Sequence, residues 1–219
     1  MIRSARAGLA VAVAVAALAG CAAPDYRYAD DAPGTAPAGT VYFKVPEAWS
    51  GFTAAQITAA QKGWAGDATA KPLLDATAWQ EAFDASGTPS LTHVLGSTPP
   101  DAPVVYASLR SLYQAEIDSV SVSSLQDVLM PVSTLGSRVT VRASDPVEQG
   151  SAKGLHLVVS FKASDNAPEE TVDETAYLSQ GNDALYLLVV RCTSACYDRE
   201  RTDIDTVTSS YTIKEGSRG

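Results

Sequence analysis

Residues 185–190, which read Leu-Tyr-Leu-Leu-Val-Val, constrain the fold of this chain more than any other stretch. Large apolar side chains fall on both faces of a strand here, so that strand has to be covered above and below. Residues 180–183, Gln-Gly-Asn-Asp, have the composition of a hairpin turn. An earlier alternating run at 155–161 supplies a second apolar strand. The last third of the chain therefore predicts a central strand in an antiparallel sheet.

Helical spacing predicts three main helices around this sheet. The first covers residues 53–62, and the second lies within residues 67–85, with Thr77 as its possible N-cap and a stripe that includes Trp79 and Phe83. Ser194 is expected to cap a final helix whose apolar side recurs through residue 211. A shorter helix is expected at 125–129, because Pro131 disfavours helical geometry in the residue before it.

The remaining β-rich runs complete an α+β domain with a mostly antiparallel sheet and helices on both of its faces. These runs are residues 40–45, 91–95, 104–113, 139–143 and 171–178. Residues 143–154 carry two glycines, a proline and several polar side chains, which predicts a loop or a long turn. With 46% hydrophobic and 19% charged residues, the composition is that of a globular chain, and residues 40–219 are expected to form one domain.

The N-terminus carries a secretory signal pattern. Arg3 and Arg6 precede an apolar run at 7–17, and Leu18-Ala19-Gly20-Cys21 resembles a bacterial lipobox. The resemblance implies cleavage after residue 20 and a diacylglycerol on Cys21. A transmembrane anchor or an ordinary cleaved signal are the alternatives, but a spanning helix needs about 20 apolar residues and this run is shorter.

Residues 21–39 are rich in Ala, Pro, Asp and Gly, which predicts a flexible tether between the lipid and the domain. Removal of residues 1–20 takes away two arginines and no acid, so 14 basic residues would face 25 acidic ones, a net charge of −11. This charge disfavours nucleic acid and anionic headgroups as partners.

With Cys21 assigned to the lipid, Cys192 and Cys196 are the remaining pair in an oxidising compartment. A zinc site is the alternative, but it needs four ligands and the chain has only His93 and His156 to add. A disulfide is therefore expected, and its small loop should mainly fix a local turn.

No catalytic, nucleotide-binding or metal motif occurs in the sequence. His93 and His156 have no partner pattern around them and are expected to be structural, so neither a cofactor nor a metal is predicted. Trp49, Trp64 and Tyr106 lie beside turns and are the candidate lining of a ligand groove, although core packing is the more ordinary role for such residues.

Several packing motifs resemble the Mog1/PsbP-like group and small actinobacterial lipoproteins. They are the opening strand that stops at Pro46-x-x-Trp49, residues 172–177, residues 186–192, Cys196-Tyr197 and residues 204–213. The resemblance implies an antiparallel sheet between helices and members that act by binding partners. It carries over no catalytic residue.

These features together predict a lipid-anchored protein on the extracytoplasmic face of the cell membrane. Its expected role is a non-catalytic binding module for an extracytoplasmic protein or an envelope component. The alternative is a small-molecule carrier or a cell-envelope hydrolase whose site the sequence does not reveal.

Overall fold

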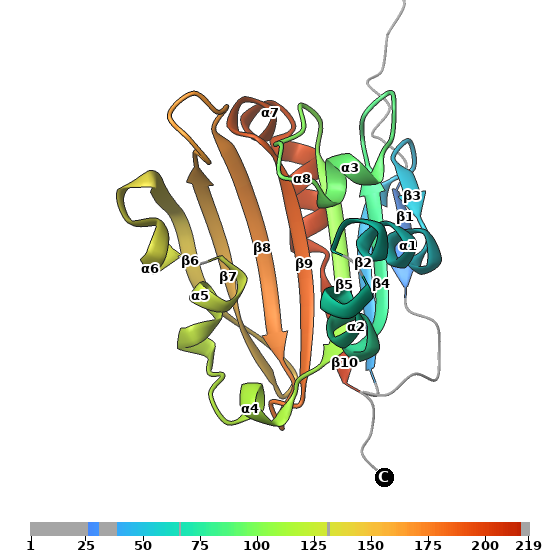
Figure 1. Cartoon of the computed structure of the whole chain (residues 1–219), viewed down its shortest axis with the longest axis vertical. Coiled ribbons are helices and arrows are strands. Elements are labelled where there is room, and N and C mark those ends of the chain that lie inside the picture. The colour runs from blue at the N-terminus through green and yellow to red at the C-terminus, as the bar shows by residue number, and fades with distance from the viewer. Residues whose placement is uncertain (1–25, 31–38, 66, 131, 216–219) are drawn as a thin grey trace, which may run out of the picture.

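The computed structural model describes residues 26–30, 39–65, 67–130 and 132–215. Two antiparallel sheets form the domain (Figure 1). The large sheet has seven strands, in the order β3 (Ser50–Phe52), β4 (Thr77–Asp84), β5 (Val104–Ser111), β9 (Ala184–Thr193), β8 (Glu170–Leu178), β7 (Ala152–Phe161) and β6 (Val139–Gln149). The small sheet has three, in the order β1 (Tyr26–Asp30), β2 (Gly39–Pro46) and β10 (Thr212–Glu215).

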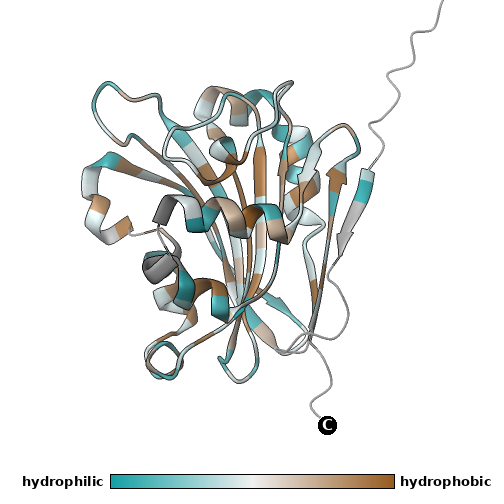
Figure 2. Ribbon diagram, turned by 45° about the vertical axis from the view of Figure 1, so that its right-hand side comes forward, coloured by the Kyte–Doolittle hydropathy of each residue, from teal (hydrophilic) through white to brown (hydrophobic). Residues whose placement is uncertain are grey.

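The predicted central strand is confirmed, because β9 is the fourth of the seven strands. Its even-numbered residues, such as Tyr186 and Leu188, pack with β2 and with α8 (Arg201–Ser209). Its odd-numbered residues, such as Leu185, pack with α5 (Leu125–Leu129) on the opposite side. We call these two sides of the large sheet the α8 face and the α5 face. Figure 2 shows hydrophobic residues along the strands between these layers.

Helices cover both faces, as predicted. The α8 face also carries α7 (Ser194–Arg199) and the small sheet, with Phe43 of β2 packed edge-on against Phe83 of β4 at 5.9 Å between ring centroids. The α5 face is covered by a first group, α1 (Ala54–Ala65), α2 (Asp67–Ala76) and α3 (Leu91–Leu95), and by a second group that includes α4 (Gln114–Ile117), η1 (Val122–Ser124), α5, α6 (Val132–Leu135) and η2 (Gly136–Arg138).

The fold class is therefore confirmed, while several elements differ from the prediction. The helix predicted after a Thr77 cap is wrong, because residues 77–84 form β4, and the helix in this region, α2, ends at Ala76. The predicted strand at 91–95 is helix α3, because the side chain of Ser90 accepts a hydrogen bond from the Thr92 amide and caps it. The predicted loop at 143–154 is wrong: β6 continues to Gln149, and β7 begins at Ala152.

Two further differences concern the ends of the domain. Thr193, and not Ser194, caps the helix after β9, and that helix divides at Glu200 into α7 and α8. Within the predicted tether, Tyr26–Asp30 form β1 and pair with β2. Cys21 lies outside the described residues. In the described part of the chain, no helix is long and apolar enough to cross a membrane.

Candidate functional site

The structure does not bring the three predicted groove residues together. Trp49 is 7% exposed and belongs to the core of the α8 face. Tyr106 is half-buried on the α5 face, where its hydroxyl donates to Gln80 Oε1 at 3.0 Å. Trp64 lies in α1, and its side chain is outside what the structure describes. A shared groove is therefore wrong for Trp49 and Tyr106, because the large sheet separates them.

An apolar cavity of about 290 Å³ lies on the α5 face, at the end of the large sheet near α4. Its walls are the buried side chains of Leu112, Leu125, Leu178 and Leu185 together with Val120. These residues come from the segment after β5, from α5 and from the adjoining ends of β8 and β9. The cavity thus forms where three separate parts of the chain meet.

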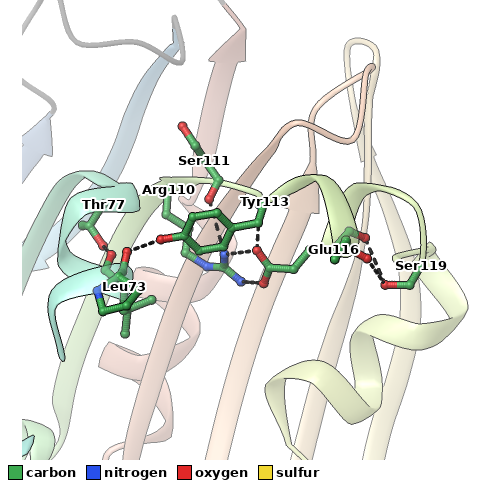
Figure 3. Close-up of polar contacts among 9 residues, drawn as sticks. Leu73, Thr77, Arg110, Ser111, Tyr113, Glu116 and Ser119 are labelled. Atoms are coloured by element: carbon green, nitrogen blue, oxygen red, sulfur yellow. Dashed lines mark hydrogen bonds and ion pairs between the residues drawn. The ribbon is translucent and has the colours of Figure 1, made fainter. Parts of the chain in front are cut away.

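A bidentate ion pair forms the charged edge of this cavity. Figure 3 shows this pair beside α4. Arg110 donates from Nη1 and Nη2 to the two carboxylate oxygens of Glu116, at 3.0 and 2.8 Å. Glu116 also accepts from the Tyr113 amide at 2.9 Å and so caps α4. The Arg110 hydrogen bonds, helped by this amide against the effect of burial, lower the pKa of Glu116. The carboxylate is therefore held ionised beside an apolar space.

Tyr113 connects this edge to the first helical group. Its hydroxyl donates to the carbonyl oxygen of Pro72 in α2, although the residue is 49% exposed (Figure 3). One turn later, Thr77 Oγ1 donates to the Leu73 carbonyl at 2.8 Å. The Tyr113 bond ties the loop before α4 to α2, and the Thr77 bond closes the end of α2. The position of the cavity edge therefore depends on both helical groups.

The arrangement suits binding better than chemistry. The lining also includes Asp127 and two serines, Ser119 and Ser124. Apolar walls with polar groups at the edge can hold an apolar group and orient a polar one. Sequence reasoning missed the cavity, because its leucines follow the same periodicity as ordinary core residues. The one local signal was Glu116, an acidic residue three positions after the helix cap at Tyr113. Such a residue indicates the start of a helix rather than a binding site.

His93 has a buried partner that the sequence did not predict. Its Nδ1 lies 2.7 Å from Asp84 Oδ2, and Ser86 Oγ lies 3.5 Å from the same nitrogen. A nucleophilic relay needs the acid and the hydroxyl on different ring nitrogens, so this arrangement is not one. Burial opposes ionisation of Asp84, but the amides of Ser86 and Ser90 outweigh it and lower the pKa of Asp84. The cluster therefore fixes the turn before α3.

His156 also has a buried carboxylate partner, on the α8 face. Its Nε2 lies 2.9 Å from Asp173 Oδ1, while Tyr197 donates to Asp173 Oδ2 at 2.7 Å. The bond to Asp173 raises the pKa of His156 although burial opposes it. Among the described side chains, no hydroxyl or thiol is hydrogen-bonded to this ring. Asp173 therefore orients a histidine that does not activate a nucleophile.

The two C-terminal cysteines are joined by a disulfide, with 6.0 Å between their Cα atoms. It connects the end of β9 to the first turn of α7, and both residues are fully buried. Within the described ranges, no group of three or more His, Cys, Asp or Glu side chains is placed to hold a metal ion.

Comparison with solved structures identifies the architecture. LpqN, a Mycobacterium tuberculosis protein involved in cell envelope biogenesis, superposes with a TM-score of 0.50 at 12% identity, over 86% of this chain and 91% of LpqN. The chain shares the fold of LpqN. The α+β fold implied by the resemblance to the Mog1/PsbP-like group is the one that the structure has.

Two other solved structures are similar at lower TM-scores. Cyanobacterial PsbP from Synechocystis gives 0.49 at 11% identity, over 91% of this chain and 99% of that protein. The Saccharomyces cerevisiae Ran-binding protein Mog1p gives 0.45 at 9% identity, over 87% and 96%. No protein-family model matches the sequence, and a search of curated proteins finds no match.

Proposed function

We propose that this protein is a lipoprotein, anchored through Cys21 to the extracytoplasmic face of the cell membrane, and that it acts there as a non-catalytic binding module. Its partner would be an extracytoplasmic protein or another envelope component. The apolar cavity on the α5 face carries the binding role. The sequence of residues 18–21 supports the anchor.

The size of the cavity, at the lower end of the range for small-molecule pockets, suits one large apolar side chain of a partner. Pockets for small molecules usually enclose about 300–1,000 Å³, and this cavity encloses about 290 Å³. Protein interfaces commonly place one or two large anchor side chains in such pockets. The Arg110–Glu116 pair at the edge would then select the polar groups that flank the anchor.

A small-molecule carrier is the second candidate, because the same cavity could enclose a short apolar ligand. Native mass spectrometry of protein purified from the envelope distinguishes the two functions. If the native protein carries an additional small molecule that is released when the protein is denatured without detergent, the carrier function is supported. A cavity that remains empty supports the binding module.

The anchor is tested by fractionation of cells that carry Cys21→Ser. The parent should remain with the membrane after a high-salt wash and be released by detergent, while the variant should be soluble. Mass spectrometry of the parent's N-terminal peptide should find a diacylglyceryl group on Cys21. A variant that is as membrane-bound as the parent contradicts the anchor.

The binding role is tested by crosslinking in intact cells with a variant that fills the cavity. Val120 lines the cavity and is half-buried, so the larger side chain of Val120→Trp should fill the space and abolish the crosslink to the partner. Ser137→Trp is the matched control, because it places the same side chain on the exposed η2 turn. If both variants retain the same crosslinked partner, the cavity is not the binding site.

A further inference from the structure

A second, more polar cavity of about 380 Å³ lies on the α8 face, between α8 and strands β6 to β8. Its lining includes His156 and Thr175 on neighbouring strands, Tyr177 and Tyr211, and Asp205 and Thr208 of α8. Tyr177 and Leu178 are consecutive residues of β8 that face opposite sides of the sheet. This cavity is therefore separate from the apolar one.

The charges around this cavity favour a positive group. Asp173 is 2% exposed and faces His156 from β8. Asp145 of β6 lies opposite His156 in the pairing of β6 with β7. Asp205 lies in the lining and binds Arg201, the one cation that faces His156 from α8. Asp205 is the carboxylate in the printed lining, and Asp145 and Asp173 lie beside His156. Three carboxylates thus face two cationic groups, Arg201 and protonated His156, while Tyr197 of α7 adds a neutral hydroxyl that is already bound to Asp173.

The aromatic residues of the lining add two tyrosine rings and one unused hydroxyl proton. Tyr211 is 3% exposed, and its buried hydroxyl has no hydrogen-bond partner among the described residues, so the residue offers its ring to the cavity. Tyr177 accepts a hydrogen bond from Gln149 Nε2 at 3.0 Å, so its own proton is not used in that bond. The two tyrosine rings lie 6.0 Å apart. Carboxylates and tyrosine rings together are a common environment for organic cations.

We infer that this cavity binds an organic cation with a primary amine or guanidinium group, held by Asp205 and the tyrosines and opposed by protonated His156. The inference does not depend on the proposed function, because the two cavities lie on opposite faces. A free amine and a basic side chain of a polypeptide present the same chemistry, and the experiment distinguishes them.

Agmatine is the probe, because it carries both a guanidinium and an amine, and the chain has only two histidines to follow by proton NMR. Agmatine should shift the ring signals of His156 saturably and lower the pKa of His156, since binding and protonation oppose each other reciprocally. The ring signals of His93 should not move, and sodium chloride at equal ionic strength should not reproduce the effect. An unchanged His156 pKa at high agmatine overturns the inference.

A matched pair of variants locates the site. Asp205→Asn should weaken agmatine binding by about fivefold, as expected for loss of a partly exposed ion pair. Asp198→Asn removes an exposed carboxylate from α7 that is paired with Arg142 and does not line the cavity, so it should leave binding unchanged. Equal effects from the two variants also overturn the inference, because the shift would then report net charge only.

A short peptide with one arginine between two alanines, blocked at both ends, identifies the source of the cation. If the peptide binds more tightly than agmatine, the site receives a basic side chain of a polypeptide. If agmatine binds more tightly, the site receives a free amine. If neither binds, the cavity does not recognise organic cations.

Discussion

The hydroxyl of Tyr197 donates a hydrogen bond of 2.7 Å to the buried carboxylate of Asp173. This bond joins α7 to β8, two elements that are separated in the chain by the whole of β9. The other oxygen of the same carboxylate holds His156, so one aspartate connects a helix and two strands.

Tyr197→Phe should destabilise the protein by about 1–3 kcal/mol, because it leaves one oxygen of a buried carboxylate without its donor. The free energy of unfolding in urea measures the change. Tyr113→Phe is the control, since its hydroxyl bond to Pro72 lies on the surface and its loss should cost less. Equal losses in the two variants would show that the burial of Asp173 has no special effect.

Glu174 makes stability depend on pH. It is 3% exposed on the α5 face of β8, between Leu157 and Val189 of the adjacent strands, and its Oε1 has no partner among the described residues. Burial, assisted by the charge of Asp173, raises the pKa of Glu174 from 4.5 to about 8. The folded state therefore keeps a proton that the unfolded chain has already lost.

The contribution of Glu174 is fully present below its unfolded pKa and is lost as the pH rises through its folded pKa. The free energy of unfolding should thus fall by a few kcal/mol between about pH 5 and pH 9, and Glu174→Gln should make that fall smaller. His156 titrates in both proteins, so its contribution to the pH dependence cancels when the two are compared. Parallel pH profiles of parent and variant would contradict the prediction.

The disulfide should contribute modestly. It joins two residues that are only four positions apart in the sequence. For so small a loop the chain-entropy model gives a stabilisation of about 2 kcal/mol. Replacement of both Cys192 and Cys196 by alanine should therefore lower the free energy of unfolding by about that amount without loss of the fold. Thiol titration of the denatured, unreduced mature protein should find neither cysteine free, and two free thiols would exclude the bond.

Gly154 allows β7 and β8 to approach closely. A Cβ atom on Gly154 would lie 1.9 Å from the carbonyl oxygen of Ala176 in β8, a backbone atom that cannot move aside without the strand. Gly154→Ala should therefore destabilise by about 1–3 kcal/mol or more, as expected for overpacking. Gly87→Ala is the control, because nothing lies within 4 Å of its Cβ position, and it should be nearly neutral in thermal unfolding.

The sequence predicted the elements whose periodicity is unambiguous. Residues 185–190 form the central strand, because a run that is apolar on both faces fits only a covered position. The helix predicted for residues 77–84 was wrong for a related reason. Ala82 and Phe83 are buried on opposite faces of β4, so their spacing also matched a helix. Burial on both sides removes the alternation that identifies a strand.

The edge of the sheet was missed because its residues resemble a loop. Among the described strands, β6 pairs only with β7, so most of its side chains are exposed and polar. Pro146 is therefore tolerated where a central strand would need its amide. The pairing partners of His93 and His156 were also unpredictable. Asp84 and Asp173 reach them only through strand register and a tight turn, which no local pattern encodes.

The pairing of β1 with β2 shortens the distance between the domain and the proposed lipid. Tyr26, the first residue of β1, is only five positions after Cys21, with four residues between them. Fully extended, five residues reach at most about 18 Å. The lipidated protein would therefore hold its domain almost against the headgroups and restrict the directions in which it can turn, so a partner would have to present its binding epitope at that same height above the bilayer.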